Sequence, residues 1–444
     1  MTGRHSALKP PHRSALRRQI AGRLSWGIAD QAVSSLGNFL LGVFVARLLG
    51  AEGLGALGLA FVAYAIALNC SRALSTDAVM VRFSAVGSDR WRDAVAAAGG
   101  VALLSGLVSG ALCVTLGLAL KLHTPGSQVG AAFVALGIVL PGLMLQDSWR
   151  SAFFAAGQGV KTFLNDVVWT VLMIGGLALG YVLDLRGITF ALLVFGGTAW
   201  VAALFGIWQA KIVPRPREAI GWLRRHRDLG LRFLVENVVL GAGGQIRSLV
   251  VAATGGLAAA GAIRGAEMVI GPVAALLMGV GQVAVPEAAR ALTRGRRALL
   301  IIAGGLSGGL AVVAMMWGIV LVLVFPLGIG RLLLGDVWPH AHVLVLGVMV
   351  SSAAGCAQVG PSAALRALGR ADLTMRCQIT ATVLFVGLAT AGAVLWDAQG
   401  TVWGTAIASI LGAGIWWSQL LAALRKRFAV PARDDATAAE GAAA

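Results

Sequence analysis

The sequence predicts an all-α integral membrane protein, with about twelve transmembrane helices in two six-helix, pseudo-symmetric lobes around a central cavity. Two observations predict this class. Hydrophobic residues make up 58% of the 444 positions and charged residues only 12%, about half the charged share of a soluble domain. The mean hydropathy is +0.83, and a soluble core cannot bury that much apolar surface in a chain of this length. The composition therefore argues against a soluble enzyme, a disordered scaffold and a secreted disulfide-rich domain.

Twelve apolar stretches have the length of a transmembrane helix, which needs roughly 20 predominantly apolar residues. The 60 glycines are spread through these stretches rather than gathered in loops, a pattern typical of membrane helices that pack closely through small residues. The predicted spans are 25–48, 55–80, 94–120, 129–148, 166–183, 188–210, 231–254, 260–284, 298–325, 342–361, 374–396 and 400–423.

The distribution of Lys and Arg supports this count and predicts the orientation. If both termini are cytoplasmic, the cytoplasmic segments hold 29 of the 36 basic residues and the external loops hold four. Basic loops stay on the cytoplasmic side of a membrane. We therefore predict a multi-pass protein of a bacterial cytoplasmic (plasma) membrane with both termini inside. The asymmetry also explains the net charge of +17 without a nucleic-acid partner.

Two internal echoes predict that the chain is built from two related halves. GAEGLGAL at residues 50–57 recurs as GLAAAGAI at 256–263, and FFAAGQGVKT (Phe153–Thr162) recurs as LRALGRADLT (Leu365–Thr374). The predicted parts are a basic cytoplasmic N-terminus (1–24), an N-lobe (25–210), a basic cytoplasmic linker (211–230), a C-lobe (231–423) and a disordered cytoplasmic tail (424–444).

Three segments resemble polysaccharide-export flippases of the multidrug/oligosaccharidyl-lipid/polysaccharide (MOP) exporter superfamily. They are QAVSSLGNFLLGVFVARLLGAEGLGALGLA (Gln31–Ala60), LQDSWRSAFFAAGQGVKTFLNDVVW (Leu145–Trp169) and GPSAALRALGRADL (Gly360–Leu373). The superfamily also includes lipid II flippases and multidrug and toxin extrusion (MATE) antiporters. The resemblance implies a monomer in which two lobes rock about a central cavity. It also implies an undecaprenyl-pyrophosphate-linked oligosaccharide as cargo, moved from the inner to the outer leaflet. No functional residue is carried over from the family.

Three arginines lie within predicted spans: Arg72, Arg247 and Arg264. A charge at mid-membrane costs about 2.5–3.5 kcal/mol, so it normally faces the bundle interior or a watery cavity. Guanidinium groups bind phosphate oxygens bidentately. These arginines are therefore candidates for binding the diphosphate of a lipid-linked saccharide, and pairing with nearby acids is the structural alternative.

Four carboxylates are candidates for coupling transport to a proton or sodium gradient, because buried acids in membranes commonly carry protons. They are Asp30, Asp77, Glu236 and Glu267. The alternative is a fixed counter-ion role, in which Arg72 pairs with Asp30 or Asp77 and Arg264 pairs with Glu267. Asp30 and Glu236 occupy the same position in the two predicted repeats, which favours them as coupling residues.

Polar residues follow helical spacing in the first and seventh spans. Asp30, Ser34 and Asn38 share one face of the first, and Asn237 and Gln245 belong to a similar stripe in the seventh. Asn38 and Gln245 are therefore candidates for the cavity wall. Hydrogen bonding to a neighbouring helix is an equal alternative.

Other polar clusters carry weaker predictions. We expect the charges at the end of the fourth span to solvate a cytoplasmic loop, Trp338 to anchor the chain at the external interface, and His340 and His342 to be solvated rather than metal-bound. The linker stretch Trp222–Phe233 interleaves Arg with apolar residues and could lie on the anionic inner leaflet. The end of the fourth span and the start of the fifth contain Gln146, Asp147, Arg150, Lys161, Asn165 and Asp166.

These observations favour a transporter that flips lipid-linked oligosaccharides for polysaccharide export. The first alternative is an ion-coupled small-molecule or multidrug antiporter of the same fold, although the mid-span arginines disfavour the usual cationic cargo. A membrane polysaccharide polymerase or ligase is a further alternative. Such an enzyme needs a large external loop, and no external connection exceeds about 20 residues. We therefore expect no enzymatic activity, cofactor or metal.

Overall fold

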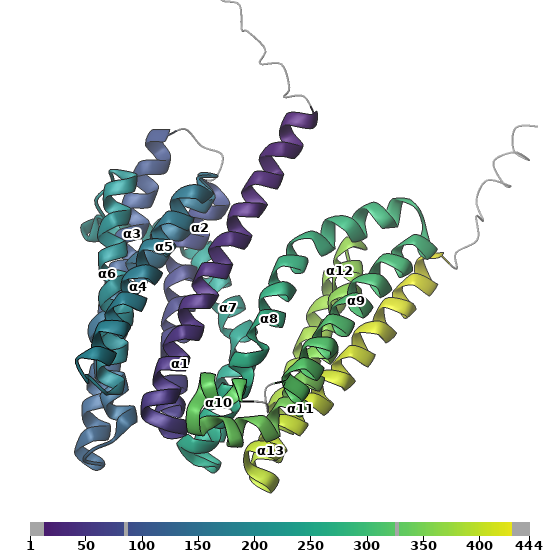
Figure 1. Ribbon diagram of the computed structural model, residues 1–444. Coiled ribbons are helices and arrows are strands. Elements are labelled where there is room, and N and C mark those ends of the chain that lie inside the picture. The colour runs from purple at the N-terminus through teal and green to yellow at the C-terminus, as the bar shows by residue number, and fades with distance from the viewer. Residues whose placement is uncertain (1–12, 84–87, 325–327, 429–444) are drawn as a thin grey trace, which may run out of the picture. The chain divides into compact units, whose positions relative to one another are not determined.

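The computed structural model describes residues 13–83, 88–324 and 328–428, and all of their regular structure is helical (Figure 1). Within these ranges, side chains are not described for residues 13–25, 88, 235–236, 238–240, 242, 274–279, 281–283, 286 and 371. The helices are α1 (Arg13–Leu74), α2 (Thr76–Arg82), α3 (Ser88–His123), α4 (Gln128–Ala155), α5 (Gly159–Val182), α6 (Ile188–Ala210), η1 (Pro216–Glu218), α7 (Ala219–Thr254), α8 (Gly256–Thr293), α9 (Arg296–Val324), α10 (Ile329–Leu334), η3 (Gly335–Val337), α11 (Trp338–Ala357), α12 (Val359–Ala367) and α13 (Ala371–Phe428).

Eight helical stretches in the described residues are long and apolar enough to cross a bilayer. Two of them, Trp26–Arg82 and Asp372–Phe428, have 57 residues each, more than twice what one crossing needs. The predicted seventh and eighth spans fall in α7 and α8, which contain side chains outside the described set. The predicted spans are helical apart from short interruptions, such as Ser75 between α1 and α2 and Gln358 between α11 and α12. The predicted all-helical membrane fold is confirmed.

The two longest helical stretches each contain a break at which the chain turns back. Asp397 leaves the helical region with φ 48° and ψ −131°, and the halves of α13 then pack so closely that a Cβ on Gly392 would collide with the carbonyl oxygen of Gly400. In α1, Gly50 adopts φ 65° and ψ −160°. Asp30 and Arg72 flank this break, and both bond to one short stretch of α4. Because a straight helix would separate them by about 63 Å, α1 must also double back.

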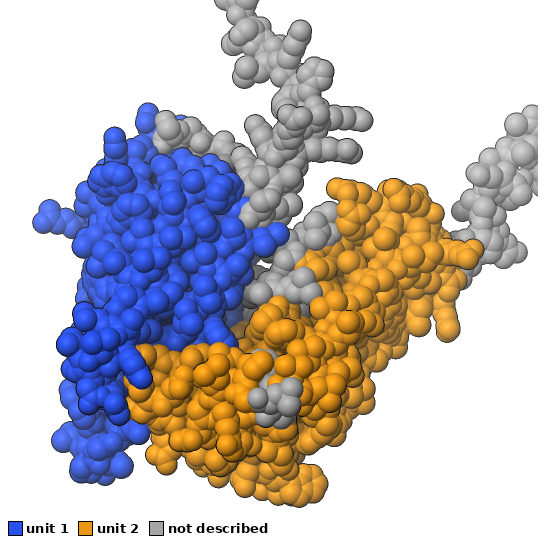
Figure 2. Space-filling model, viewed as in Figure 1, with its two compact units in different colours: residues 1–41, 63–238 blue, residues 42–62, 239–444 orange. Residues whose placement is uncertain are grey.

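The chain forms two compact units, coloured separately in Figure 2. Unit 1 comprises residues 1–41 and 63–238, and unit 2 comprises residues 42–62 and 239–444. The turn of α1 therefore belongs to unit 2, whereas the predicted N-lobe held all of residues 25–210. In unit 1, α4 packs against α3 and α6; in unit 2, α11 packs against α8, α9 and α13.

Glycines allow the closest helix contact in unit 1, between α3 and α4. A Cβ on Gly117 would lie 2.7 Å from the carbonyl oxygen of Gly130, and a Cβ on Gly137 would lie 2.5 Å from that of Gly110. Any larger residue at these positions would separate the two backbones. The glycines in these two spans therefore serve the close helix packing that their distribution predicted.

The two sequence echoes share backbone geometry as well as composition. Gly50 and Gly256 both have positive φ, at 65° and 77°. Gly157 and Gly369 do too, at 70° and 72°, and each ends a helix in the left-handed conformation that glycine tolerates best. The residue after each glycine donates its N–H back to a carbonyl five residues earlier, at 2.8 Å and 3.0 Å. The second echo thus corresponds to two matching helix ends, and the organisation of the chain into two repeats stays a prediction.

One anchor predicted from the sequence is wrong. Trp338 is only 4% exposed, because its ring packs on Gly330 of α10 and lies 5.2 Å from the ring of His342. Its side chain belongs to the interior of unit 2 rather than to a membrane interface. His340 on the same helix is exposed, as expected, whereas Nε2 of His342 is buried, so the predicted solvation holds for His340 only.

Candidate functional site, a buried charge network in unit 1

Helix α4 carries three buried polar residues in succession, Gln146, Asp147 and Ser148. Gln146 and Asp147 are 2% and 5% exposed, because neighbouring helices, chiefly α3 and α6, enclose this part of α4. Asp147 and Arg150 are three residues apart and therefore lie on one side of the helix. A polar side chain enclosed in this way needs partners inside the unit.

Arg72 forms a bidentate ion pair with Asp147. Its Nε donates to Oδ2 at 2.8 Å and its Nη2 to Oδ1 at 2.5 Å. Planar, two-point pairing of this kind is the strongest guanidinium–carboxylate geometry. While this pair persists, both carboxylate oxygens of Asp147 are occupied and Arg72 has a partner inside the unit. The partner is neither Asp30 nor Asp77, the two acids considered from the sequence. A substrate role for Arg72 stays a prediction.

Arg150 lies between two further carboxylates. Its Nε and Nη2 both donate to Oδ2 of Asp30, at 2.8 and 2.5 Å, and its Nε is 3.6 Å from Oδ2 of Asp166. Asp30 and Asp166 are 0% and 1% exposed. The other oxygen of Asp30, Oδ1, is buried and accepts no hydrogen bond from the described residues.

Neutral side chains from three helices surround Asp166 and fix its position on α5. The hydroxyl of Ser34 donates to Oδ2 at 2.9 Å, and the amide of Gln146 donates to Oδ1 at 2.7 Å. The adjacent Asn165 donates to the carbonyl of Ala202 on α6 at 2.9 Å. The network therefore joins α1, α4, α5 and α6.

The charges in this network do not balance. Its carboxylates are Asp30, Asp147 and Asp166, whereas its guanidiniums are those of Arg72 and Arg150. Lys161 lies at the edge, where its ammonium donates to the backbone carbonyl of Gln209 at 3.2 Å rather than to a carboxylate. One negative charge is thus in excess among the described residues of the network. A buried charge of this kind is neutralised by a proton or by a bound cation.

Sequence reasoning missed most of this site. The stretch 146–166 was expected to solvate a loop, and this prediction is wrong because α4 continues to Ala155 and α5 begins at Gly159. Arg150, predicted to lie beyond the fourth span, consequently lies within α4, and Asp147 and Asp166, predicted at the span ends, lie well inside α4 and α5. One available signal was the absence of a glycine or proline between Gly142 and Gly157, which allows the helix to run past the predicted end of the fourth span.

The other predicted site residues of unit 1 lie outside the charge network. Asp77 on α2 accepts a hydrogen bond from the amide of Asn237 at 3.2 Å. Asn38 is exposed on α1, two helical turns from Asp30, as the stripe predicted. The side chain of Glu236 lies outside the described residues, so the structure shows nothing of its predicted coupling role.

A smaller charged cluster lies in unit 2. Arg247 on α7 forms an ion pair with Glu267 on α8, and its guanidinium lies 5.5 Å from the ring centre of Phe385. Arg264 lies over the ring of Phe61 at 5.5 Å, so the predicted pairing of Arg264 with Glu267 is replaced by the contact of Glu267 with Arg247. Arg264 forms no ion pair with any residue that the structure describes.

Gln245 is half-buried on α7, two residues before this cluster. No group of three His, Cys, Asp or Glu in the searched part of the chain has the arrangement needed to hold a metal ion.

The fold is that of MATE transporters of the MOP superfamily. The chain is similar to an inward-facing multidrug resistance MATE family transporter, with a TM-score of 0.66 and 18% identity over 88% of this chain and 96% of the other. An outward-facing structure of a multidrug resistance MATE family transporter matches with a TM-score of 0.58 and 18% identity, over 92% of this chain and 96% of the other. A MOP superfamily transporter from Pyrococcus furiosus is described as having a binding pocket of reverse polarity. It matches with a TM-score of 0.54 and 16% identity, over 91% of this chain and 95% of the other. The sequence matches no family profile and no curated protein.

Proposed function

We propose that the chain is an ion-coupled transporter that exports small organic molecules across the membrane by alternating access. The observation that carries the coupling is the excess carboxylate of the charge network, together with Oδ1 of Asp30, which accepts no hydrogen bond from the residues that the structure describes. The likeness of the fold to multidrug transporters supports the small-molecule cargo. This was the alternative in the sequence analysis, where three mid-span arginines disfavoured a cationic cargo. The ion pairs of Arg72 with Asp147 and of Arg247 with Glu267 answer this objection for two of the three, and Arg264 remains.

The coupling step follows from the position of Arg150. With Asp30 and Asp166 both ionised, Arg150 is drawn to both carboxylates and holds α1, α4 and α5 together. A proton on either carboxylate weakens one of these attractions, so the three helices then prefer a different packing. A transporter needs such a bistable element, whose equilibrium an ion can shift through its different affinity for the two states.

The test is transport into proteoliposomes carrying a proton or sodium gradient, with a fluorescent organic cation as cargo. Asp30→Asn removes the carboxylate whose Oδ1 accepts no hydrogen bond from the described residues, and we expect it to abolish gradient-driven transport while leaving the protein folded. Asp184→Asn is the matched control, because Asp184 forms its ion pair with Arg186 on the exposed α5–α6 connection. Coupled transport by Asp30→Asn at the wild-type rate would exclude this mechanism.

A lipid-linked oligosaccharide flippase is the second candidate function, favoured by the cluster in unit 2. Arg247 and Arg264 together outnumber Glu267, and Arg264 has an unpaired charge among the described residues. A guanidinium in this situation suits the phosphate oxygens of an undecaprenyl-pyrophosphate carrier. Protein-dependent exposure of a fluorescent carrier to an outside quencher would support flipping, provided that Arg264→Gln abolishes it and Arg331→Gln, an exposed arginine of α10, does not.

Either function places the chain in a plasma membrane as a multi-pass transporter. Its other partners would be the lipid bilayer and the coupling ion, and neither function needs a cofactor, a nucleic acid or an enzymatic step. We propose a monomer in both cases. The two candidates differ in the charge of the cargo, which the two transport assays compare directly.

A further inference from the structure

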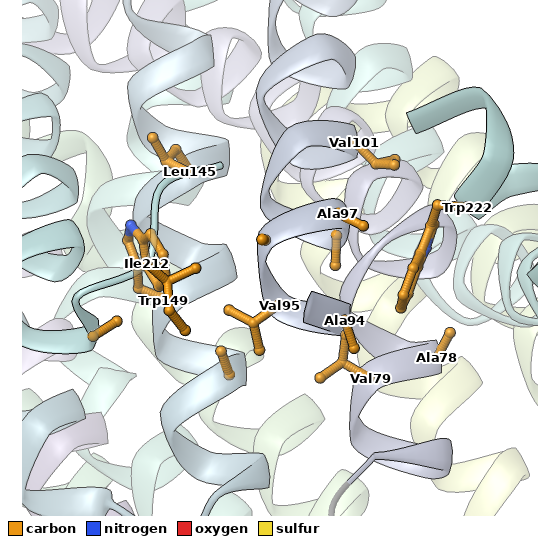
Figure 3. Packing of buried hydrophobic residues seen from close by; sticks show 14 of the residues in the cluster. Ala78, Val79, Ala94, Val95, Ala97, Val101, Leu145, Trp149, Ile212 and Trp222 are labelled. Atoms are coloured by element: carbon orange, nitrogen blue, oxygen red, sulfur yellow. The ribbon is translucent and has the colours of Figure 1, made fainter. Parts of the chain in front are cut away.

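The first turns of α7 are fixed to unit 1 by a buried tryptophan. Trp222 is 2% exposed, and its Nε1 donates to the carbonyl of Leu74 at the end of α1 at 3.2 Å. Figure 3 shows its ring beside Ala78 of α2 and Val101 of α3, within the apolar cluster of this unit. The segment is therefore held against unit 1 along one face.

Ionic contacts fix the same face. Arg82 of α2 donates to Nδ1 of His226 at 2.7 Å and to the carboxylate of Asp228 at 2.5 Å. The other acid of the segment, Glu218, is 3.3 Å from Arg215. Each acid of this segment is thus already matched to an arginine.

The opposite face of the segment is apolar and cationic. Ile220 and Leu223 are 64% and 36% exposed, and Arg224 and Arg227 are exposed as well. Ile220, Leu223 and Arg224 are three or four residues apart and precede the break of the helix at His226, so they form one surface. Arg227 follows directly after the break. Neither arginine forms an ion pair within the part of the chain that the structure describes, so their charges are available to a partner.

We propose that this outward face, made by Ile220, Leu223 and Arg224 together with Arg227 just after the break at His226, binds anionic phospholipid headgroups of the adjacent membrane leaflet. The charge complementarity is direct, because the acids are neutralised on the inner face and the free guanidiniums lie outside. The position agrees with this occupant. The segment follows α6, a candidate membrane span that ends at Ala210, after a connection of eight residues that includes η1.

A lipid surface explains the mixture of residues better than a soluble acidic partner does. Exposed Ile and Leu next to Arg are typical of a helix lying in a membrane interface, where the apolar groups enter the acyl boundary and the guanidiniums meet phosphates. Anionic lipids attract such basic segments within a short distance of the surface. The inference does not depend on the cargo.

The experiment measures which lipid contacts the face. Ile220→Cys, in a background without the four native cysteines, is labelled with a fluorophore and placed in bilayers of phosphatidylcholine and phosphatidylglycerol. One or the other lipid carries bromine as a quencher. We expect brominated phosphatidylglycerol to quench about twofold more strongly than brominated phosphatidylcholine. The preference should vanish in Arg224→Gln/Arg227→Gln and persist in Arg186→Gln/Arg331→Gln, which changes two exposed arginines elsewhere.

Equal quenching by the two lipids would overturn the proposal, as would a preference that survives Arg224→Gln/Arg227→Gln. Quenching that disappears when the protein is diluted in the bilayer would assign the face to a second copy of the chain instead. Native mass spectrometry needs no cysteine replacement and gives an independent measurement. Wild-type protein should retain more phosphatidylglycerol than Arg224→Gln/Arg227→Gln, and equal retention would contradict the inference.

Discussion

At the scale of single residues, Arg150 is the side chain whose loss should destabilise the charge network most. It compensates two buried carboxylates, Asp30 and Asp166, and its own side chain is only 20% exposed. We predict that Arg150→Gln destabilises the protein by about 3–5 kcal/mol, because breaking a buried ion pair leaves an uncompensated charge. The midpoint of denaturant-induced unfolding in detergent measures this effect.

The control uses a solvent-exposed pair of the same chemistry. Arg186 contacts Asp184 at 2.5 Å, but the two side chains are 61% and 72% exposed. Arg186→Gln should therefore change stability by about 0–1 kcal/mol. If Arg150→Gln unfolds at the wild-type midpoint, the charge network does not contribute to stability as its geometry indicates.

The second prediction at this scale concerns recovery of stability. Adding Asp30→Asn to Arg150→Gln removes one of the two carboxylates that the first substitution leaves uncompensated. We expect the double variant to be more stable than Arg150→Gln alone, since contacting residues are not additive. The same unfolding measurement gives the coupling free energy, and strict additivity of the two substitutions would contradict the proposed contact.

Part of the residue-level site could be predicted from the sequence. Asp30 was identified because a charged residue in an apolar span is costly unless it has a partner or a function, and it lies within the network. Its partner Arg150 was assigned to a loop, because a predicted span ends where charged residues accumulate. Hydropathy does not distinguish the end of a helix from a helix that continues with buried, paired charges. Which arginine meets which acid depends on helix packing, so the pairs of Arg72 and Arg247 could not be read from spacing.

At the scale of helices, close packing makes a direct prediction for α13. A Cβ on Gly404 would collide with the carbonyl oxygen of Leu388 on the other half of the hairpin. We predict that Gly404→Ala costs about 1–3 kcal/mol, because the two halves must move apart. Gly387 on the same helix has open space around its Cα. Gly387→Ala should therefore be neutral or stabilising by up to about 1 kcal/mol in the same unfolding measurement.

The start of α7 should dock to unit 1 in a pH-dependent way. The pKa of His226 lies below its ordinary value of 6.5, because of burial and then the nearby Arg82 and Arg225. The undocked segment thus binds a proton more readily than the docked one, so the docking contribution is complete above pH 6.5 and declines as the pH falls below it. Hydrogen-exchange protection of residues 219–226, corrected for intrinsic rates, should decrease on acidification.

His226→Gln is the control for this pH dependence. Glutamine can still accept a hydrogen bond from Arg82 but does not titrate, so its protection should be independent of pH in the same range. An equal loss of protection in the wild type and in His226→Gln would place the responsible group elsewhere.

At the scale of the whole molecule, the helical character of the spans could be predicted, because length and hydropathy determine where a helix can cross a bilayer. The predicted spans are helical apart from short interruptions such as those at Ser75 and Gln358. The assignment of residues 42–62 to unit 2 has another cause. Gly55 and Gly261 allow the turn of α1 to contact the start of α8, where a Cβ on either would meet the other helix's backbone. A contact between segments some 200 residues apart leaves no periodic signal in a single sequence.

Orientation is the remaining whole-molecule property, and it rests on whether each 57-residue stretch crosses the membrane twice. If it does, the breaks at Gly50 and Asp397 lie outside the cell, and every basic connection lies inside. Glu52→Cys and Asp397→Cys should then react with an impermeant maleimide in intact cells, since both positions are exposed. Arg225→Cys and Arg296→Cys should react only after permeabilisation. Labelling of Arg225→Cys in intact cells would show that the orientation is the reverse of the predicted one. Failure of Asp397→Cys to react, with Glu52→Cys labelled, would instead show that α13 turns at a depth the reagent cannot reach.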